Sequence, residues 1–421
     1  MTDLRGLPSG SSSSPARESH ERALWHLVSF YGDPMAAFDA TIAADPDWGL
    51  ARVVKAVFIL TLTEPNMLPQ ARQLLTEAEP LMAGAPAHEQ AHCAAAQAAL
   101  AGRWREACTR WDALLLDQPR DLLALSAAHL FDFYRGDARN LRARVARVLP
   151  EWPADDPLQP YVQGMHAFGL EECNLYPQAE AAGREALERD PRGPWAIHAV
   201  AHVMEMQGRH DEGVRWLEDG SAGWADNGLA VHLWWHLALF DARIAGSASV
   251  VNLQWLDGAA LLWRLQLLGV DVGARWQSLA ADWADPVRHA GHYAFNDVHA
   301  LLALLGSGDI TRAQALLAAS TQQANADNAG MAREVGVPLM QGLVAYASGD
   351  VDTACATLYP LRSVAHHFGG SHAQRDLIDQ TLLAAAARSS HKAAGRALLN
   401  ERRLAKPNTP LTAHWVSRLG A

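Results

Sequence analysis

Two pairs of histidines in the middle of the chain have the residue type and the spacing of a metal site. His198 and His202 are four residues apart, and so are His232 and His236. Residues four apart share one face of a helix, so each pair presents two imidazoles together. Zinc accepts imidazole nitrogen, and zinc with three protein ligands keeps a position for water. The two pairs therefore predict a site for a divalent metal such as zinc.

The two pairs are also one repeat length apart. His198 and His232 are separated by 34 residues, as are His202 and His236. Helical hairpins of the tetratricopeptide type repeat about every 34 residues, and equivalent positions of stacked repeats lie side by side. A longer series has nearly the same period: His92, His129, His166, His202 and His236. One such residue alone is more typical of a packed histidine. The shared period favours a shared role in metal binding, proton transfer or anion binding.

Carboxylates near these histidines extend the candidate site. Glu205 follows His198 and His202 on the same helix face, and it could serve as a metal ligand or a general base. Asp297 and His299 lie in the apolar stretch AFNDVHALLALLG, where helix packing alone would not select them. The residues with an expected catalytic role are Glu205, Asp297, His299 and His202.

Other polar residues predict substrate binding. Two glycines precede a helix start at Ser371, and glycines before a helix N-terminus can receive an anion. Arg375 can hold a carboxylate through two parallel hydrogen bonds. The expected substrate-binding residues are Arg375, Gln374, Asp376, Asn296, Glu172, His166 and Trp235. Structural alternatives remain open, because Asn296 can cap a helix and Arg375 can pair with Asp376 or Glu334.

Composition and charge argue against several classes of protein. The 421 residues carry a formal net charge of −11 without a long run of Lys or Arg, which argues against a nucleic-acid interface. No apolar run reaches the roughly 18 residues of a transmembrane helix. The four cysteines are scattered without a Cys-x-x-Cys motif, as expected for buried thiols in a reducing compartment. We expect a cytoplasmic protein that binds neither nucleic acid nor a membrane.

The pattern of turns predicts an all-α protein. Glycine-centred turns at 101–103, 135–137, 207–209 and 348–350 follow amphipathic stretches, and glycine supplies the left-handed conformation that ends a helix. We predict a tetratricopeptide-like helical-hairpin repeat array (α-solenoid) of about ten hairpins, which can close into a superhelix. The expected parts are a disordered tail at 1–20, the array at 21–405 and a C-terminal tail at 406–421. The helical pattern is interrupted at 246–258, which suggests a loop with a short helical piece, and at 320–335.

Five segments resemble one family of repeat proteins. HAVAHVMEMQG, NGLAVHLWWHLAL, AFNDVHALLALLG, REVGVPLMQGLVAYASGD and FGGSHAQRDLI occur in this order. Together they resemble the tetratricopeptide repeat protein 38 family over most of the chain. The resemblance implies an α-helical repeat array and brings no settled activity with it. The positions that match the family's motifs are Glu172, His198, His202, Glu205, His232, His236, Asn296, Asp297, His299, Gln374, Arg375 and Asp376. His372 departs from the family's pattern, which has Asn there.

Two functions remain open. Burying this many ionisable groups is costly unless they pair or bind something. That cost favours an enzyme that hydrolyses a small amide, lactam or ester in the central hollow of the array, with a divalent metal or by His–carboxylate acid–base chemistry. The alternative is a non-catalytic tetratricopeptide-type module that binds a peptide or protein. The expected partner is a small molecule or peptide in the concave hollow, and homo-oligomers are a further expectation.

Overall fold

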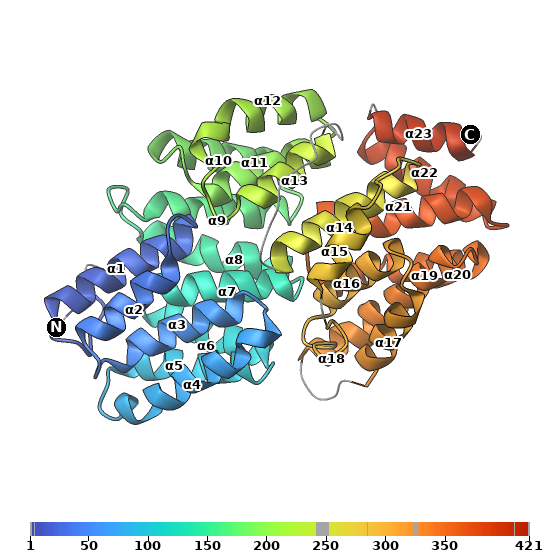
Figure 1. Ribbon diagram of the computed structural model, residues 1–421. Helices are drawn as coiled ribbons and strands as arrows, with labels where there is room; N and C mark the ends of the chain where they lie inside the picture. The colour runs from blue at the N-terminus through green and yellow to red at the C-terminus, as the bar shows by residue number, and fades with distance from the viewer. Residues whose placement is uncertain are drawn as a thin grey trace. The chain divides into compact units, whose positions relative to one another are not determined.

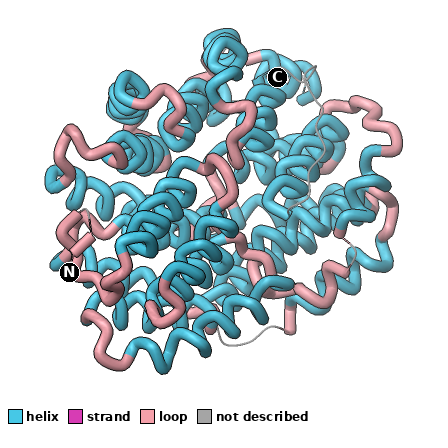
Figure 2. The backbone as a smooth tube through the Cα atoms, turned by 60° about the vertical axis from the view of Figure 1, so that its left-hand side comes forward, coloured by secondary structure: helices cyan, strands magenta, loops and turns pink. Residues whose placement is uncertain are grey.

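The computed structural model describes residues 2–3, 5–240, 252–283, 285–322, 327–407 and 409–419. Along these residues α-helices follow one another through short loops, and no strand occurs among them (Figure 1 and Figure 2). The expected all-α, tetratricopeptide-like helical-hairpin repeat array is confirmed; its closure into a superhelix stays a prediction. Among the described helices, none has both the length and the apolar character that crossing a membrane requires.

The helices form two compact units. Unit 1 comprises Met1–Val200 and Ala222–Ala230, and unit 2 comprises Ala201–Ser221 and Val231–Ala421. The division passes through α11 (Pro194–Met206), so this helix begins in unit 1 and ends in unit 2.

Unit 1 is built from consecutive helices that pack as hairpins. Helix α3 packs on α4, α5 on α6 and α9 on α10, while α3 also packs on α5 and α7. In order, the helices before α11 are α1 (Ser14–Ser29), α2 (Pro34–Ala44), α3 (Gly49–Thr61), α4 (Leu68–Ala78), α5 (Ala87–Leu100), α6 (Trp104–Asp117), α7 (Leu122–Tyr134), α8 (Ala138–Val148), α9 (Gln159–Glu171) and α10 (Tyr176–Arg189).

Unit 2 continues in the same manner, with α14 packed on both α16 and α21. After α11 its helices are α12 (His210–Gly220), α13 (Ala230–Phe240), α14 (Asn252–Leu267), α15 (Arg275–Asp282), α16 (Ala294–Gly306), α17 (Ile310–Ser320), α18 (Asp327–Met331), the π-helical turn Ala332–Gly336, α19 (Val337–Ala347), α20 (Val351–Leu361), α21 (His372–Arg388), α22 (Lys392–Ala405) and α23 (Pro410–Leu419).

Local sequence explains the tight turns within the hairpins. Gly136 has φ 65°, a left-handed conformation that a side chain would strain, and it ends α7. The next residue, Asp137, accepts a hydrogen bond from the backbone N–H of Asn140 and caps α8. Asn174 holds the same left-handed conformation, with φ 61°, at the turn between α9 and α10. Gly102, Gly208 and Gly349 also have a positive φ, so the predicted glycine-centred turns are confirmed.

Both segments that the sequence analysis assigned to tails, 1–20 and 406–421, contain helical residues. Helix α1 begins at Ser14, and the Ser13 side chain caps it. Arg5 forms an ion pair with Glu21, with 2.7 Å between Nη2 and Oε1. At the other end α23 packs on α22, and Trp415 is fully buried. The Ser-rich composition suggested disorder, but a serine followed by proline also starts a helix. Of the expected interruptions, residues 246–251 and 323–326 lie outside the described residues, whereas 252–258 belong to α14.

Candidate metal centre

The two histidine pairs lie on α11 and α13. His198 and His202 are one turn apart on α11, and His232 and His236 are one turn apart on α13. Three of the four belong to unit 2. His198 lies in the part of α11 counted with unit 1, and the continuous helix holds it one turn from His202.

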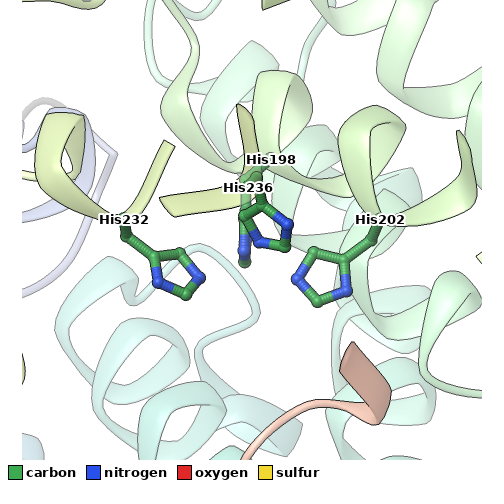
Figure 3. Close-up of side chains that lie close together, drawn as sticks. All are labelled: His198, His202, His232 and His236. Carbon is green, nitrogen blue, oxygen red and sulfur yellow. The ribbon is translucent and has the colours of Figure 1, made fainter. Parts of the chain in front are cut away.

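The four imidazoles gather in one place, with His232 and His202 on either side of the other two (Figure 3). One ring nitrogen from each lies within 4.8 Å of the other three. The ring centroids of His202 and His236 are 4.4 Å apart, and those of His232 and His236 are 4.7 Å apart. Tetrahedral zinc with bonds of about 2.0–2.1 Å separates its ligand atoms by about 3.3 Å, so modest side-chain rotation would close the site.

Burial keeps the His202 ring in the form that binds a metal. His202 and His236 are fully buried and His198 is 4% exposed, whereas the His232 side chain is 16% exposed. Burial lowers the pKa of His202 well below its usual 6.5, and neighbouring positive charges add to this effect. A neutral imidazole has the free lone pair that a metal needs.

Asp257 orients one of the rings. Its Oδ2 lies 2.8 Å from Nδ1 of His232, and Asp257 is 4% exposed. A carboxylate at Nδ1 holds the proton on that nitrogen and leaves Nε2 as the ligand atom. Ligating histidines in metal sites commonly have such a partner, which fixes the ring and raises its basicity. Sequence reasoning missed Asp257 because residues 246–258 were interpreted as a loop. The available signal was an acidic residue within the apolar run WLDGAALLW.

Trp235 stacks on the His232 ring, and Arg264 lies over the ring of Trp235. The ring centroids of Trp235 and His232 are 5.1 Å apart, and the Arg264 guanidinium lies 5.6 Å from the Trp235 ring centroid. Arg264 also donates hydrogen bonds to the carbonyls of Ala373 and Gln374, at 2.8 and 3.2 Å. Through these contacts α13 and α14 are connected to the first turn of α21.

Glu205 takes part in a buried ion pair. Its Oε1 accepts a hydrogen bond from Nζ of Lys406 at 2.8 Å, with side chains 10% and 6% exposed. Its Oε2 lies 3.8 Å from Nε2 of His210. The pair connects α11 to the segment that follows α22. The roles of Glu205 as a general base or metal ligand stay predictions.

The predicted residues of α16 make local contacts. Oδ2 of Asp297 accepts hydrogen bonds from the Gly291 N–H at 2.7 Å and the Ser320 hydroxyl at 3.3 Å. Nδ1 of His299 lies 2.8 Å from the Phe295 carbonyl. Within the described residues, neither belongs to the group of possible metal ligands that the four histidines form. Their catalytic roles stay predictions.

The contacts of Asp297 predict an unusual dependence of stability on pH. Burial raises its pKa to about 7, although the hydrogen bonds from Gly291 and Ser320 oppose the shift. An unfolded aspartate has a pKa of about 3.9, so the folded chain holds a proton that the unfolded chain has lost. The stability from this proton is present near about pH 4 and is lost as the pH rises through about 7.

We expect Asp297→Asn to remove this dependence. The variant should match the wild type near about pH 4 and be more stable by up to about 4 kcal/mol near pH 8. Urea unfolding across this pH range measures the difference in free energy of unfolding. If the free energies of unfolding of the two proteins changed with pH in parallel, the prediction would be contradicted.

The predicted residues of α21 lie in its first turn. Gln374 completes a capping box with Ser371. Arg375 donates a hydrogen bond to the carbonyl of the glycine just before Ser371. Asp376 pairs with Arg402, with 3.0 Å between Oδ1 and Nη1. The partner of Asp376 is therefore an arginine from α22, and substrate binding by these residues stays a prediction.

A cleft of about 420 Å³ opens beside this turn, within unit 2. Arg375, Asp376 and Arg402 line it, together with residues of α22 and the 3₁₀ turn Ala365–Phe368. Its volume lies in the range of sites for small ligands, about 300–1,000 Å³. The described lining does not include the four histidines.

The remaining predicted residues are half-buried or buried. His166 lies on α9 and Glu172 directly follows that helix, both in unit 1. Burial lowers the pKa of His166, and Glu172 is 5% exposed. Asn296 is half-buried on α16. Their roles in binding stay predictions.

Comparisons with known proteins add little about function. No family model matches the chain. Among solved structures, the chain is similar to one described as the crystal structure of the APC/C hetero-tetramer Cut9-Hcn1. The match has 12% sequence identity and a TM-score of 0.45, and it covers 99% of this chain and 78% of that chain. At this level of similarity the match carries no argument.

Proposed function

We propose that this protein binds a divalent transition-metal ion, with zinc as the first candidate, through His202, His232 and His236. The observation that carries the proposal is the convergence of imidazole nitrogens within 4.8 Å. The orientation of His232 by Asp257 supports it independently. The set of nitrogen ligands suits zinc, copper or nickel better than magnesium or calcium, which prefer oxygen.

The number of ligands decides what the metal does. The rings of His202, His236 and His232 form a continuous series of contacts, whereas the His198 ring lies beside Phe168 and Trp195. Three imidazole ligands leave a position for water, whose pKa zinc lowers to about 7. Hydrolysis of a small amide, lactam or ester is the activity that this arrangement would support. If His198 also binds, the closed site would instead tie α11 to α13.

Metal titration of purified protein tests the proposal. We expect one zinc ion per chain by elemental analysis and by isothermal titration calorimetry after chelation. Asp257→Asn should weaken zinc binding roughly 10- to 100-fold, because the His232 ring loses the carboxylate that orients it. Asp282→Asn, the same change at an exposed position of α15, is the matched control. Zinc binding that is absent, or unaffected by Asp257→Asn, would argue against the site.

The second candidate is a module that binds a peptide or protein. The cleft of unit 2 supports it, because its size and its mixture of Arg375, Asp376 and Arg402 suit a polar ligand. Peptide binding that survives metal chelation would favour this candidate over a metal-dependent hydrolase. We also propose that the chain belongs to the tetratricopeptide repeat protein 38 family. A cytoplasmic location and homo-oligomerisation are further proposals.

A further inference from the structure

A second group of buried ionisable side chains lies wholly within unit 1. Five members line one small pocket, and each is at most 9% exposed: His20, His88, Glu89, His92 and Asp121. They come from α1, from α5 and from the residue that caps α7. Residues of the N-terminal segment before α1 complete the wall. The pocket has a volume of about 30 Å³, which is enough to hold a group of about the size of a water molecule.

Asp121 fixes the ring of His92. Its Oδ2 lies 2.7 Å from Nε2 of His92, and its Oδ1 accepts a hydrogen bond from the Ala124 N–H at 3.0 Å. Burial alone would raise the pKa of Asp121, but His92 and these hydrogen bonds outweigh it, so this pKa lies below its usual value. The carboxylate is ionised and holds a proton on Nε2. The second ring nitrogen, Nδ1, is buried and has no hydrogen-bond partner among the described residues.

Glu89 has a second buried polar atom without a hydrogen-bond partner among the described residues. Its Oε1 accepts hydrogen bonds from the Gly10 N–H at 2.7 Å and the Trp48 indole N–H at 3.1 Å. Its Oε2 is buried, and no described residue offers it a hydrogen bond. Glu89 and His92 are three residues apart on α5, so both belong to one helix face. Each buried polar atom without a partner costs about 1–3 kcal/mol, so an occupant that donates hydrogen bonds would stabilise the fold.

We propose that this pocket binds a protonated primary amine, whose –NH₃⁺ group donates hydrogen bonds to Oε2 of Glu89 and Nδ1 of His92. The pocket has room for a small group such as –NH₃⁺. The lining favours a cation because it holds four carboxylates and two guanidinium groups: Asp3, Glu21, Glu89, Asp121, Arg5 and Arg17. The amine can belong to a small molecule or to a lysine side chain of a peptide. This site is independent of the metal site proposed above.

Two ammonium salts test the proposal on the full chain. Methylammonium chloride should raise the melting temperature with saturation, whereas tetramethylammonium chloride at equal concentration should not, because it has no N–H to donate. Since both salts are compared on the wild type, the result does not depend on the folding of a variant. Glu89→Gln should weaken methylammonium binding at least about tenfold, a loss of about 1.4 kcal/mol. Glu188→Gln, an exposed position on α10, should leave it unchanged.

A competition experiment with peptides identifies the source of the amine. A lysine peptide that competes with methylammonium, while its acetyl-lysine form does not, would assign the site to a protein partner. Binding of methylammonium alone would assign it to a small amine. Equal effects of the two salts, or an unchanged affinity in Glu89→Gln, would mean that an ordered water alone fills the pocket, and this would overturn the proposal.

Discussion

Replacement of His202 by alanine is expected to lower zinc affinity by roughly 100- to 1,000-fold. Structural zinc sites bind with about 10–16 kcal/mol, which amounts to about 2.5–4 kcal/mol for each of four ligands. His202 is fully buried, and its ring lies 4.4 Å from that of His236, at the centre of the group. Competition with a chromogenic chelator measures the change without depending on an unknown substrate.

Two further variants make this result specific. His289→Ala removes an imidazole of unit 2 that is outside the histidine group, and it should leave zinc affinity unchanged. His198→Ala distinguishes a site of three imidazoles and a water from a closed site of four imidazoles. If three imidazoles suffice, the loss of His198 should lower zinc affinity by less than about tenfold. An equal, large loss in His198→Ala and His202→Ala would instead indicate a closed, structural site. Unchanged affinity in His202→Ala would exclude this residue as a ligand.

The fold was predictable because its signals are local. A glycine in the left-handed conformation at 136 and the capping aspartate at 137 define a turn within a few residues, whatever the rest of the chain does. The same local rules act at the ends of the chain. Ser13 caps α1, and the burial of Trp415 holds α23, yet the surrounding polar composition outweighed both signals in the sequence interpretation.

The site was only half predictable, for a related reason. The members of each histidine pair are four residues apart, and the repeat period brings the two pairs together. Both spacings can be read from the sequence. The residues that orient His232 and neutralise the charge of Glu205 lie far from them in the sequence. Asp257 is 25 residues from His232, and Lys406 is 201 residues from Glu205. Only tertiary packing selects these contacts, and no period connects their positions.

The ion pair of Glu205 and Lys406 is expected to contribute strongly to stability. Removal of one partner of a buried pair leaves an uncompensated charge and costs about 3–5 kcal/mol. We therefore expect Glu205→Gln and Lys406→Met each to lower the free energy of unfolding by this amount, measured in urea. The double variant should recover most of the loss, because no buried charge remains unpaired. Glu218→Gln, an exposed position on α12, is the control and should change stability by less than about 0.5 kcal/mol.

The same double variant separates a structural Glu205 from a catalytic one. If the carboxylate only balances Lys406, the double variant should recover stability, bind zinc normally and keep zinc-dependent hydrolysis of model esters, since the neutral pair preserves the packing of α11. If Glu205 also acts as a general base one turn from His202, the double variant should be stable and bind zinc normally, yet lack zinc-dependent hydrolysis of model esters. Single variants that lose less than about 1 kcal/mol would contradict the premise, because they would show that water reaches the pair and compensates each charge.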